Sequence, residues 1–170
     1  MFVLGIDPGL SRCGYAVVEP ERRGRGRAIA MGTLRTSPDD EIPIRLAQLY
    51  TDIVELLDEF RPAVVSVERI FFQNNISTAV GVAQASGLAL ALAAKRGIPV
   101  VQYSPSAVKS VVTGDGRADK QQVQKMVQLL LGLAELPRPA DAADAAALAL
   151  CHLAHDPGLR QAHKELEAKT

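Results

Sequence analysis

The sequence predicts an α/β domain in which a mixed β-sheet is flanked by helices. Three short apolar runs near the N-terminus are separated by turn residues, which is the pattern of β-hairpins. Segments of helical periodicity dominate the rest of the chain, with two further apolar strands between them. With 170 residues, of which 48% are hydrophobic and 22% charged, the chain can bury one substantial core.

The N-terminal part contains the predicted hairpins. The expected strands are residues 2–7, 14–18 and 28–36. The turn Pro8-Gly9 follows the first of them, and a charged, glycine-containing loop over 19–27 precedes the third. Because strands joined by hairpins are antiparallel, we expect the sheet to have an antiparallel edge rather than to be purely parallel.

Helices and two more strands follow. Pro43 opens a segment whose apolar residues recur at helical spacing, and Ser104-Pro105 has the residue types of an N-cap and a first helical position. The elements expected after the hairpins are a helix at 43–60, a strand at 63–68, a helix at 77–96, a strand at 98–103 and helices at 105–112, 119–131 and 140–155. The domain therefore spans residues 1–156, and the charged tail 157–170 has a composition compatible with disorder.

Composition limits the partners and the compartment. Nineteen basic and nineteen acidic residues give no net charge, which neither supports nor excludes a nucleic-acid partner. Two cysteines, Cys13 and Cys151, and no recognisable signal peptide predict a reducing, cytoplasmic location. Residues 76–94 carry no charge, but their many small and polar side chains favour a buried or interface helix over a membrane span.

Four carboxylates are the candidate catalytic and metal-binding residues. Asp7 and Glu68 each end an apolar strand, where a carboxylate is costly unless it is solvated or binds a metal. Neighbouring parallel strands present their carboxyl ends together, so the two can meet in one crevice. Asp141 and Asp144 lie on one face at the start of the last helix, where a shared cation would remove their repulsion. The combination predicts metal-dependent hydrolysis of a nucleic-acid backbone.

Each of these residues also has a purely structural explanation. Asp7 precedes a Pro-Gly turn, and Glu68 could lie at a frayed strand end. Asp141 and Asp144 could serve only the helix dipole, which is worth about 0.3–1 kcal/mol. The prediction therefore depends on the four together and not on any single member.

Aromatic and basic residues supply candidate DNA contacts. Phe71 and Phe72 lie in the loop after the fourth strand, and two adjacent rings in a loop cannot both face one core. One ring either clamps the loop to the core or stacks on a nucleobase, an interaction worth about 1–3 kcal/mol. Lys109, Arg117 and Lys120 belong to a basic strip that indicates either a DNA surface or ordinary solvation.

Two other groups carry weaker indications. His152 and His155 lie at helical spacing, but no further residue at ligand spacing supports a zinc site. The arginines within 22–27 lie at the predicted hairpin tip and belong to no assignable motif.

Four blocks of sequence, taken in order, match one known pattern. They are Leu4-Gly5-Ile6-Asp7-Pro8-Gly9, Val67-Glu68-Arg69-Ile70-Phe71, Gln84-Ala85-Ser86-Gly87 and Ala140-Asp141-Ala142-Ala143-Asp144-Ala145. Together they resemble the RuvC family of bacterial Holliday-junction resolvases, from residue 3 to about residue 155. The resemblance implies an RNase H-like fold with a mixed five-stranded sheet. It also implies a crossover junction endodeoxyribonuclease of recombination and DNA repair, acting as a homodimer that nicks opposed strands of four-way junction DNA.

The resemblance implies roles for individual residues. The residues that match the acidic metal-binding set are Asp7, Glu68, Asp141 and Asp144. Phe71 matches the junction-stacking aromatic, and Lys109 and Lys120 match DNA-contacting lysines. Phe72 and Arg69 vary the loop, so which ring stacks stays open. The branch-migration proteins RuvA and RuvB are implied partners.

Metal chemistry follows from the donor atoms. Carboxylate oxygens suit Mg²⁺ or Mn²⁺ rather than zinc. Two such ions about 3.5–4 Å apart would activate a water and stabilise the leaving 3′ oxygen, giving 5′-phosphate and 3′-hydroxyl ends. The helix expected at 77–96 is the predicted dimer surface, because its small residues would permit close approach of a helix from a second protomer.

Other functions remain compatible with the sequence. An RNase H-type nuclease acting on RNA–DNA hybrids and a non-catalytic junction-binding protein would share this fold. An actin-like ATPase also opens on Gly-Ile-Asp before a glycine turn, but it needs a second glycine-rich loop and a much longer chain.

Overall fold

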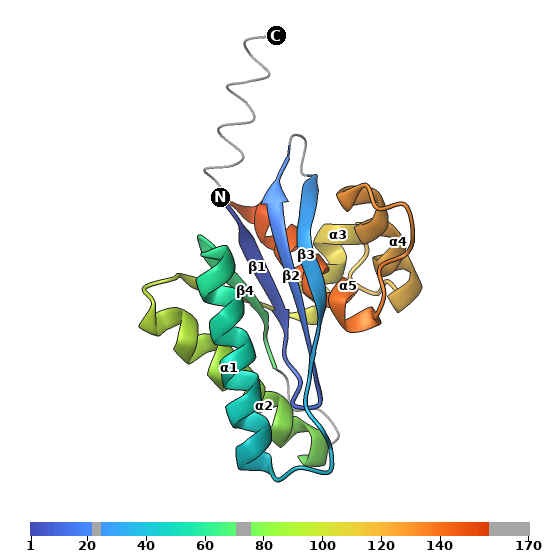
Figure 1. Cartoon of the computed structure of the whole chain (residues 1–170). Coiled ribbons are helices and arrows are strands. Elements are labelled where there is room, and N and C mark those ends of the chain that lie inside the picture. Colours follow the sequence, from blue (N-terminus) through green and yellow to red (C-terminus); the bar gives the residue numbers. More distant parts are fainter. Residues whose placement is uncertain (22–24, 71–75, 157–170) are drawn as a thin grey trace.

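A five-stranded sheet forms the centre of the computed structural model, which describes residues 1–21, 25–70 and 76–156 (Figure 1). The strands are β1 (Val3–Asp7), β2 (Arg12–Pro20), β3 (Gly26–Arg35), β4 (Val64–Glu68) and β5 (Val100–Tyr103). The helices are α1 (Ile42–Phe60), α2 (Ile76–Lys95), α3 (Pro105–Thr113), α4 (Lys120–Leu131) and α5 (Ala140–His155). The expected elements are therefore confirmed, most of them to within two residues at each end.

The sheet is mixed, as the consecutive hairpins predicted. Its strand order is β3-β2-β1-β4-β5, with β1, β2 and β3 antiparallel and β1, β4 and β5 parallel. In the parallel pair of β1 and β4, Ile6 lies opposite Val67, so the last residues of the two strands, Asp7 and Glu68, lie side by side. The two strands that end in carboxylates are thus direct neighbours.

The hairpin between β2 and β3 is longer than the sequence indicated. Pairing continues from Val18 outward to Glu19 opposite Arg27 and Pro20 opposite Gly26, so two residues at each end of the expected loop are strand. Arg27 also forms an ion pair with Glu19, which closes the end of the ladder. Opposite charges on residues that face each other across two strands stabilise the pairing of those strands. The charged and glycine residues of this segment had predicted a loop instead.

Helices cover both faces of the sheet (Figure 1). On one face, α1 and α2 bury residues such as Ile53 and Leu92 against Leu4 and Ile6 of β1. On the other face, α3, α4 and α5 pack against the alternate strand residues, including Val3. This alternation follows from the two-residue period of a strand, and it places Asp7 on the α5 face.

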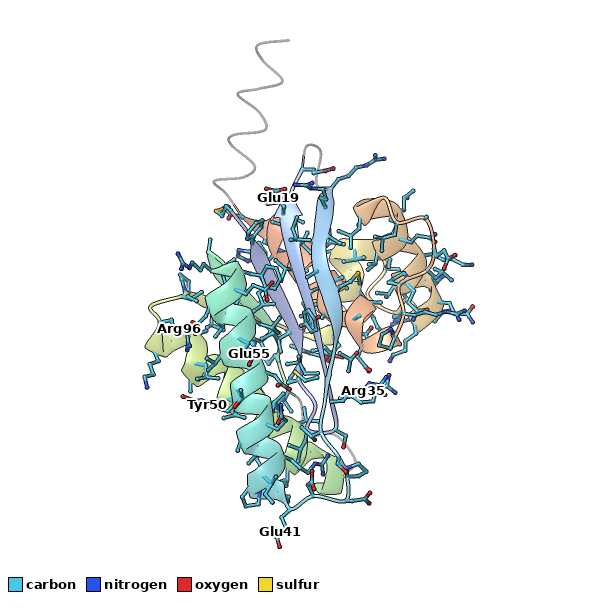
Figure 2. The ribbon with its side chains drawn as sticks, viewed as in Figure 1. Glu19, Arg35, Glu41, Tyr50, Glu55 and Arg96 are labelled. Atoms are coloured by element: carbon cyan, nitrogen blue, oxygen red, sulfur yellow. The ribbon has the colours of Figure 1, made fainter. Side chains whose placement is uncertain are left out.

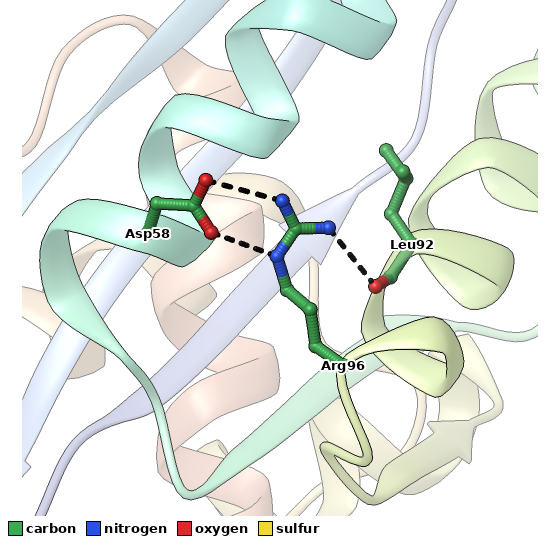
Figure 3. Close-up of polar contacts among 3 residues, drawn as sticks. All are labelled: Asp58, Leu92 and Arg96. Atoms are coloured by element: carbon green, nitrogen blue, oxygen red, sulfur yellow. Dashed lines mark hydrogen bonds and ion pairs between the residues drawn. The ribbon is translucent and has the colours of Figure 1, made fainter.

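An ion pair joins α1 to the end of α2 (Figure 3). The Arg96 guanidinium donates from Nε to Oδ1 of Asp58 at 2.8 Å and from Nη2 to Oδ2 at 3.2 Å. It also donates to the Leu92 carbonyl at 3.4 Å, and the pKa of Asp58 is lowered chiefly by these hydrogen bonds. The pair is exposed, so it orients the two helices more than it stabilises the fold.

Side-chain caps fix where α3 and α4 begin. The Ser104 hydroxyl accepts a hydrogen bond from the Ala107 amide at 3.2 Å, which confirms the predicted N-cap. Asp119 and Gln122 form a capping box at the start of α4. This capping box makes Lys120 the first residue of α4.

Among the helices of the described residues, none combines the length and the apolar character that a membrane span requires.

Candidate active site

Asp7 and Glu68 form a hydrogen-bonded carboxyl pair at the ends of β1 and β4. Both residues follow the registered neighbours Ile6 and Val67, which brings their side chains together on the α5 face. Burial, reinforced by the charge of Glu68, raises the pKa of Asp7 to about 8. Burial also raises the pKa of Glu68, while the hydrogen bond from Asp7 lowers it. The two carboxyl groups therefore share a proton in the hydrogen bond between them.

Close packing of α5 on the sheet brings the second pair of carboxylates to this place. A Cβ on Gly14 would lie 2.1 Å from the Asp141 carbonyl oxygen, and one on Gly5 would lie 1.9 Å from that of Ala145. Only glycine permits this approach of a helix backbone to β1 and β2. The buried Ser66 hydroxyl donates to the Leu148 carbonyl at 2.9 Å and fixes α5 against β4.

Each carboxylate of α5 faces a cation from a different element. Nη2 of Arg12, at the start of β2, lies 2.6 Å from Oδ2 of Asp141. Nζ of Lys120 lies 3.2 Å from Oδ2 of Asp144. The two acidic residues near the start of α5 therefore point in different directions, Asp141 towards β2 and Asp144 towards α4.

A cavity of about 330 Å³ joins most of the predicted residues. Its charged lining residues are Asp7, Glu68, Lys109, Lys120 and Asp144. Asp141 is not part of that lining, yet its charge still helps to raise the pKa of Asp7. The structure thus brings three carboxylates and two lysines to one cavity, with the fourth carboxylate at its border.

The remaining predicted contacts lie elsewhere. Arg117 is exposed in the turn before α4, where its amide donates to Asp115 at 2.8 Å, and it does not line the cavity. Phe71 and Phe72 lie outside the described residues. His152 accepts or donates a 3.0 Å hydrogen bond with the Tyr103 hydroxyl at the other end of α5, away from the carboxylates.

The donor atoms of this site fit a hard divalent cation. Oδ2 of Asp141 is buried and has no aligned hydrogen-bond donor among the described residues, since Arg12 approaches it without hydrogen-bond geometry. Asp7 and Glu68 are held partly protonated by burial and mutual repulsion, a cost that a cation would remove. As the side chains lie, no three of them in the described part are already arranged to hold one ion. Arg12 and Lys120 occupy Asp141 and Asp144 instead.

Sequence reasoning missed Arg12 and Gly14. Arg12 gave no pattern, because its partner Asp141 is distant in the sequence and only the packing of α5 brings them together. Gly14 carried a usable signal, since a glycine inside a strand indicates close approach of another backbone.

Comparisons with known proteins identify the family of the chain. The family described as crossover junction endodeoxyribonuclease RuvC matches residues 3–152. A protein of that name from Salinispora arenicola is 55% identical over 153 residues, which cover 90% of this chain and 87% of the relative. One from Pseudarthrobacter chlorophenolicus is 53% identical over 150 residues, covering 88% of this chain and 78% of the relative.

Solved structures agree as well. Thermus thermophilus RuvC in complex with a Holliday junction substrate superposes with a TM-score of 0.87 at 37% identity, covering 96% of this chain and 97% of that one. A yeast mitochondrial Holliday junction resolvase, at 17% identity and a TM-score of 0.67, covers 99% of this chain and 86% of its own length, and it shares the fold. The RNase H-like architecture, the acidic cavity and these matches lead to one conclusion: the chain belongs to the RuvC family of crossover junction endodeoxyribonucleases.

Proposed function

We propose that this endonuclease resolves four-way DNA junctions by paired, symmetric nicks in recombination and DNA repair. The observation that carries the proposal is the Asp7–Glu68 pair, which is partly buried at the ends of adjacent parallel strands in a cavity that Lys109 and Lys120 also line. Carboxylates beside cations suit a metal-assisted reaction on a phosphodiester, because the acids bind metal and the lysines bind phosphate.

The four carboxylates are the proposed metal ligands. Asp7, Glu68, Asp141 and Asp144 would hold Mg²⁺ or Mn²⁺, in two ions per site. Such ions would activate water and stabilise the leaving oxygen, and the expected products are 5′-phosphate and 3′-hydroxyl ends. The proton shared by Asp7 and Glu68 must leave for both groups to act as ligands. Lys109 and Lys120 hold the phosphate backbone over the carboxylates.

A homodimer would place two such sites on one junction. We assign α2 to the dimer surface, which is consistent with its exposed Val80 and with the small exposed residues Gly87 and Ala91. A two-fold symmetric dimer matches the near two-fold symmetry of a four-way junction. RuvA and RuvB are the proposed partners, and the cytoplasm is the proposed location.

A substrate panel tests this function. Labelled four-way junction, duplex, flap and RNA–DNA hybrid are incubated with Mg²⁺ and, separately, with Mn²⁺. We expect paired nicks in the junction, with products that a ligase can seal. Preferential cleavage of the hybrid would instead identify an RNase H-type activity. Junction binding without cleavage under any divalent metal would identify a binding protein.

A further inference from the structure

Two arginines lie near Asp141, whereas the lysines lie near Asp144 and Glu68. Arg12 is the first residue of β2 and Arg35 is the last residue of β3, and the two face each other across the antiparallel ladder. They share the α5 face of the sheet, because Arg12 contacts Asp141 on α5. Figure 2 shows Arg35 at the lower end of the hairpin and Glu19 at its upper end.

This arrangement concentrates positive charge at one edge of the site. Like charges directly opposite each other in a sheet are destabilising. Asp141 offsets the charge of Arg12, whose side chain is still 50% exposed. Arg35 is exposed, and among the residues that the structure describes its side chain has no hydrogen bond or ion pair. The arginine pair therefore retains an unbalanced charge beside the carboxylates.

Cations consequently border the carboxylates on both sides. Asp144 faces Lys120, which lines the cavity together with Lys109, whereas Asp141 faces Arg12. A DNA strand crossing the carboxylates carries a phosphate at about every 3.4 Å of helix axis, so the neighbours of the cleaved phosphate fall to either side. This distribution also explains how a chain with no net charge can present a basic surface to DNA.

We propose that Arg12 and Arg35 form an arginine edge that binds backbone phosphates of the cleaved strand on the Asp141 side of the site. The proposal rests on the junction-cleaving function proposed above. A guanidinium is suited to this role, since its planar fork of donors matches two phosphate oxygens at once. Phosphate binding also removes the repulsion between the two arginines.

The test measures how junction affinity depends on salt. Fluorescence anisotropy with a labelled four-way junction is recorded in EDTA, where no strand is cut. Each lost phosphate contact should reduce the slope of log K against log salt by about 0.7–0.9, depending on whether the strand is single or paired. Arg35→Gln should therefore flatten the slope by one contact and Arg12→Gln/Arg35→Gln by two, with weaker binding in both.

Matched variants separate charge from folding. Arg35→Lys keeps the charge and should retain the wild-type slope. Arg27→Gln removes an arginine from the other end of the same strand, where Arg27 pairs with Glu19, and should also leave the slope unchanged. Melting temperatures show that each variant compared is folded.

The failure of this proposal differs from failure of the function itself. If Arg12→Gln/Arg35→Gln keeps the wild-type slope while Lys109→Ala/Lys120→Ala flattens it, the arginine edge does not contact DNA and the proposed function stands. Equal flattening in Arg27→Gln would also overturn the assignment, because the effect would then be one of overall charge. If the wild-type protein shows no preference for the junction over duplex, the proposed function fails.

Discussion

Lys120 holds its ammonium 3.2 Å from the Asp144 carboxylate, so the first residue of α4 neutralises the second acidic residue of α5. The charge of Asp144 is the main reason that the pKa of Lys120 is raised above its usual 10.5, so the ion pair strengthens the hold of the lysine on its proton. The same lysine lines the cavity with Asp7 and Glu68. It can therefore stabilise the acidic site without metal and remain charged for a phosphate when DNA binds.

The lysines should account for part of the salt dependence of junction binding. Lys109→Ala and Lys120→Ala should each weaken binding and flatten the salt slope by about one unit, because each removes one phosphate contact. Binding titrations over a series of salt concentrations measure both effects. Lys95→Ala, at the end of α2, is a matched control that should leave the slope unchanged. An unaltered slope in the double variant would place the DNA surface away from this cavity.

The carboxylates should be needed for cleavage but not for binding. Asp7→Asn, Glu68→Gln, Asp141→Asn and Asp144→Asn each preserve shape and weaken metal ligation, so cleavage should fall by roughly 10–100-fold or more. Junction affinity in EDTA should be retained. In wild-type protein Mg²⁺ should raise the melting temperature, since ligands that bind only the folded state stabilise it.

The amide variants also test whether Mg²⁺ raises the melting temperature by binding at the active site. The rise in melting temperature with Mg²⁺ should be smaller in Asp7→Asn and Glu68→Gln than in wild type. Asp115→Asn, in the exposed turn before α4, should respond as the wild type does. Full cleavage by Asp7→Asn would rule out the shared metal site.

Strand ends were predictable from the sequence, whereas the contacts of the carboxylates were not. Asp7 and Glu68 could be placed together because apolar strands and their carboxyl ends are local patterns. The ion pair between Arg12 and Asp141 depends on how α5 crosses β2, which no local pattern describes. The extent of β2 and β3 was underestimated for a similar reason, since cross-strand pairs such as Glu19 and Arg27 continue a ladder through charged residues.

Close packing at Gly14 should make that position intolerant of any side chain. A Cβ there would lie 2.1 Å from the Asp141 carbonyl oxygen, so Gly14→Ala must displace α5 or β2. Overpacking of this kind costs about 1–3 kcal/mol, and the free energy of unfolding from urea titrations should fall accordingly. Cleavage by the folded fraction should fall as well, because Asp141 moves with the helix.

Gly87→Ala is the matched control for this effect. An added Cβ at Gly87 meets no atom within 4 Å, and alanine favours a helix interior by about 0.8–1 kcal/mol over glycine. We therefore expect equal or greater stability of the separate protomer from Gly87→Ala, measured at a protein concentration too low for the proposed dimer to form. Equal stability of Gly14→Ala and wild type would contradict the close approach of α5 to β2.

His152 should make the fold less stable in acid. Burial lowers the pKa of His152 below its usual 6.5, although the charges of Asp156 and His155 also act on it. Its contribution is therefore complete above the unfolded pKa and is lost as the pH falls below it, because the unfolded chain takes up the proton first. In His152→Gln, the change in melting temperature between about pH 7.5 and about pH 5.5 should lack this loss.

Titration of the Asp7–Glu68 pair changes stability with pH in the opposite direction to titration of His152. The effect of His152 must therefore be measured by comparing the variant with the wild-type protein at the same pH. Asp7 has a raised pKa, and its contribution falls as the pH rises towards about 8. The informative quantity is the difference between wild type and His152→Gln at each pH. His155→Gln removes a neighbouring charge that lowers the pKa of His152, so in this variant the loss of stability in acid should be smaller but should persist. An identical difference at both pH values would show that His152 does not titrate on folding.

The adjacent rings Phe71 and Phe72 should divide the roles of DNA contact and core packing. Phe71 is the third residue after Glu68 in the sequence, and we expect Phe71→Ala to impair cleavage of intact junctions much more than thermal stability. Stacking on a base is worth about 1–3 kcal/mol, which corresponds to roughly 5–150-fold in rate. Single-turnover cleavage and melting curves measure the two effects separately.

A junction that is already open at the crossover should rescue Phe71→Ala, because the cost of unstacking, about a few kcal/mol, no longer has to be met during the reaction. Phe72→Ala is the matched variant and should behave in the opposite way, with a lower melting temperature and cleavage largely retained per folded molecule. If Phe71→Ala instead lowers the melting temperature strongly and cleaves both junctions at the wild-type rate, its ring belongs to the core. Equal loss of cleavage on intact and opened junctions would assign Phe71 to binding of the strand rather than to opening of the crossover.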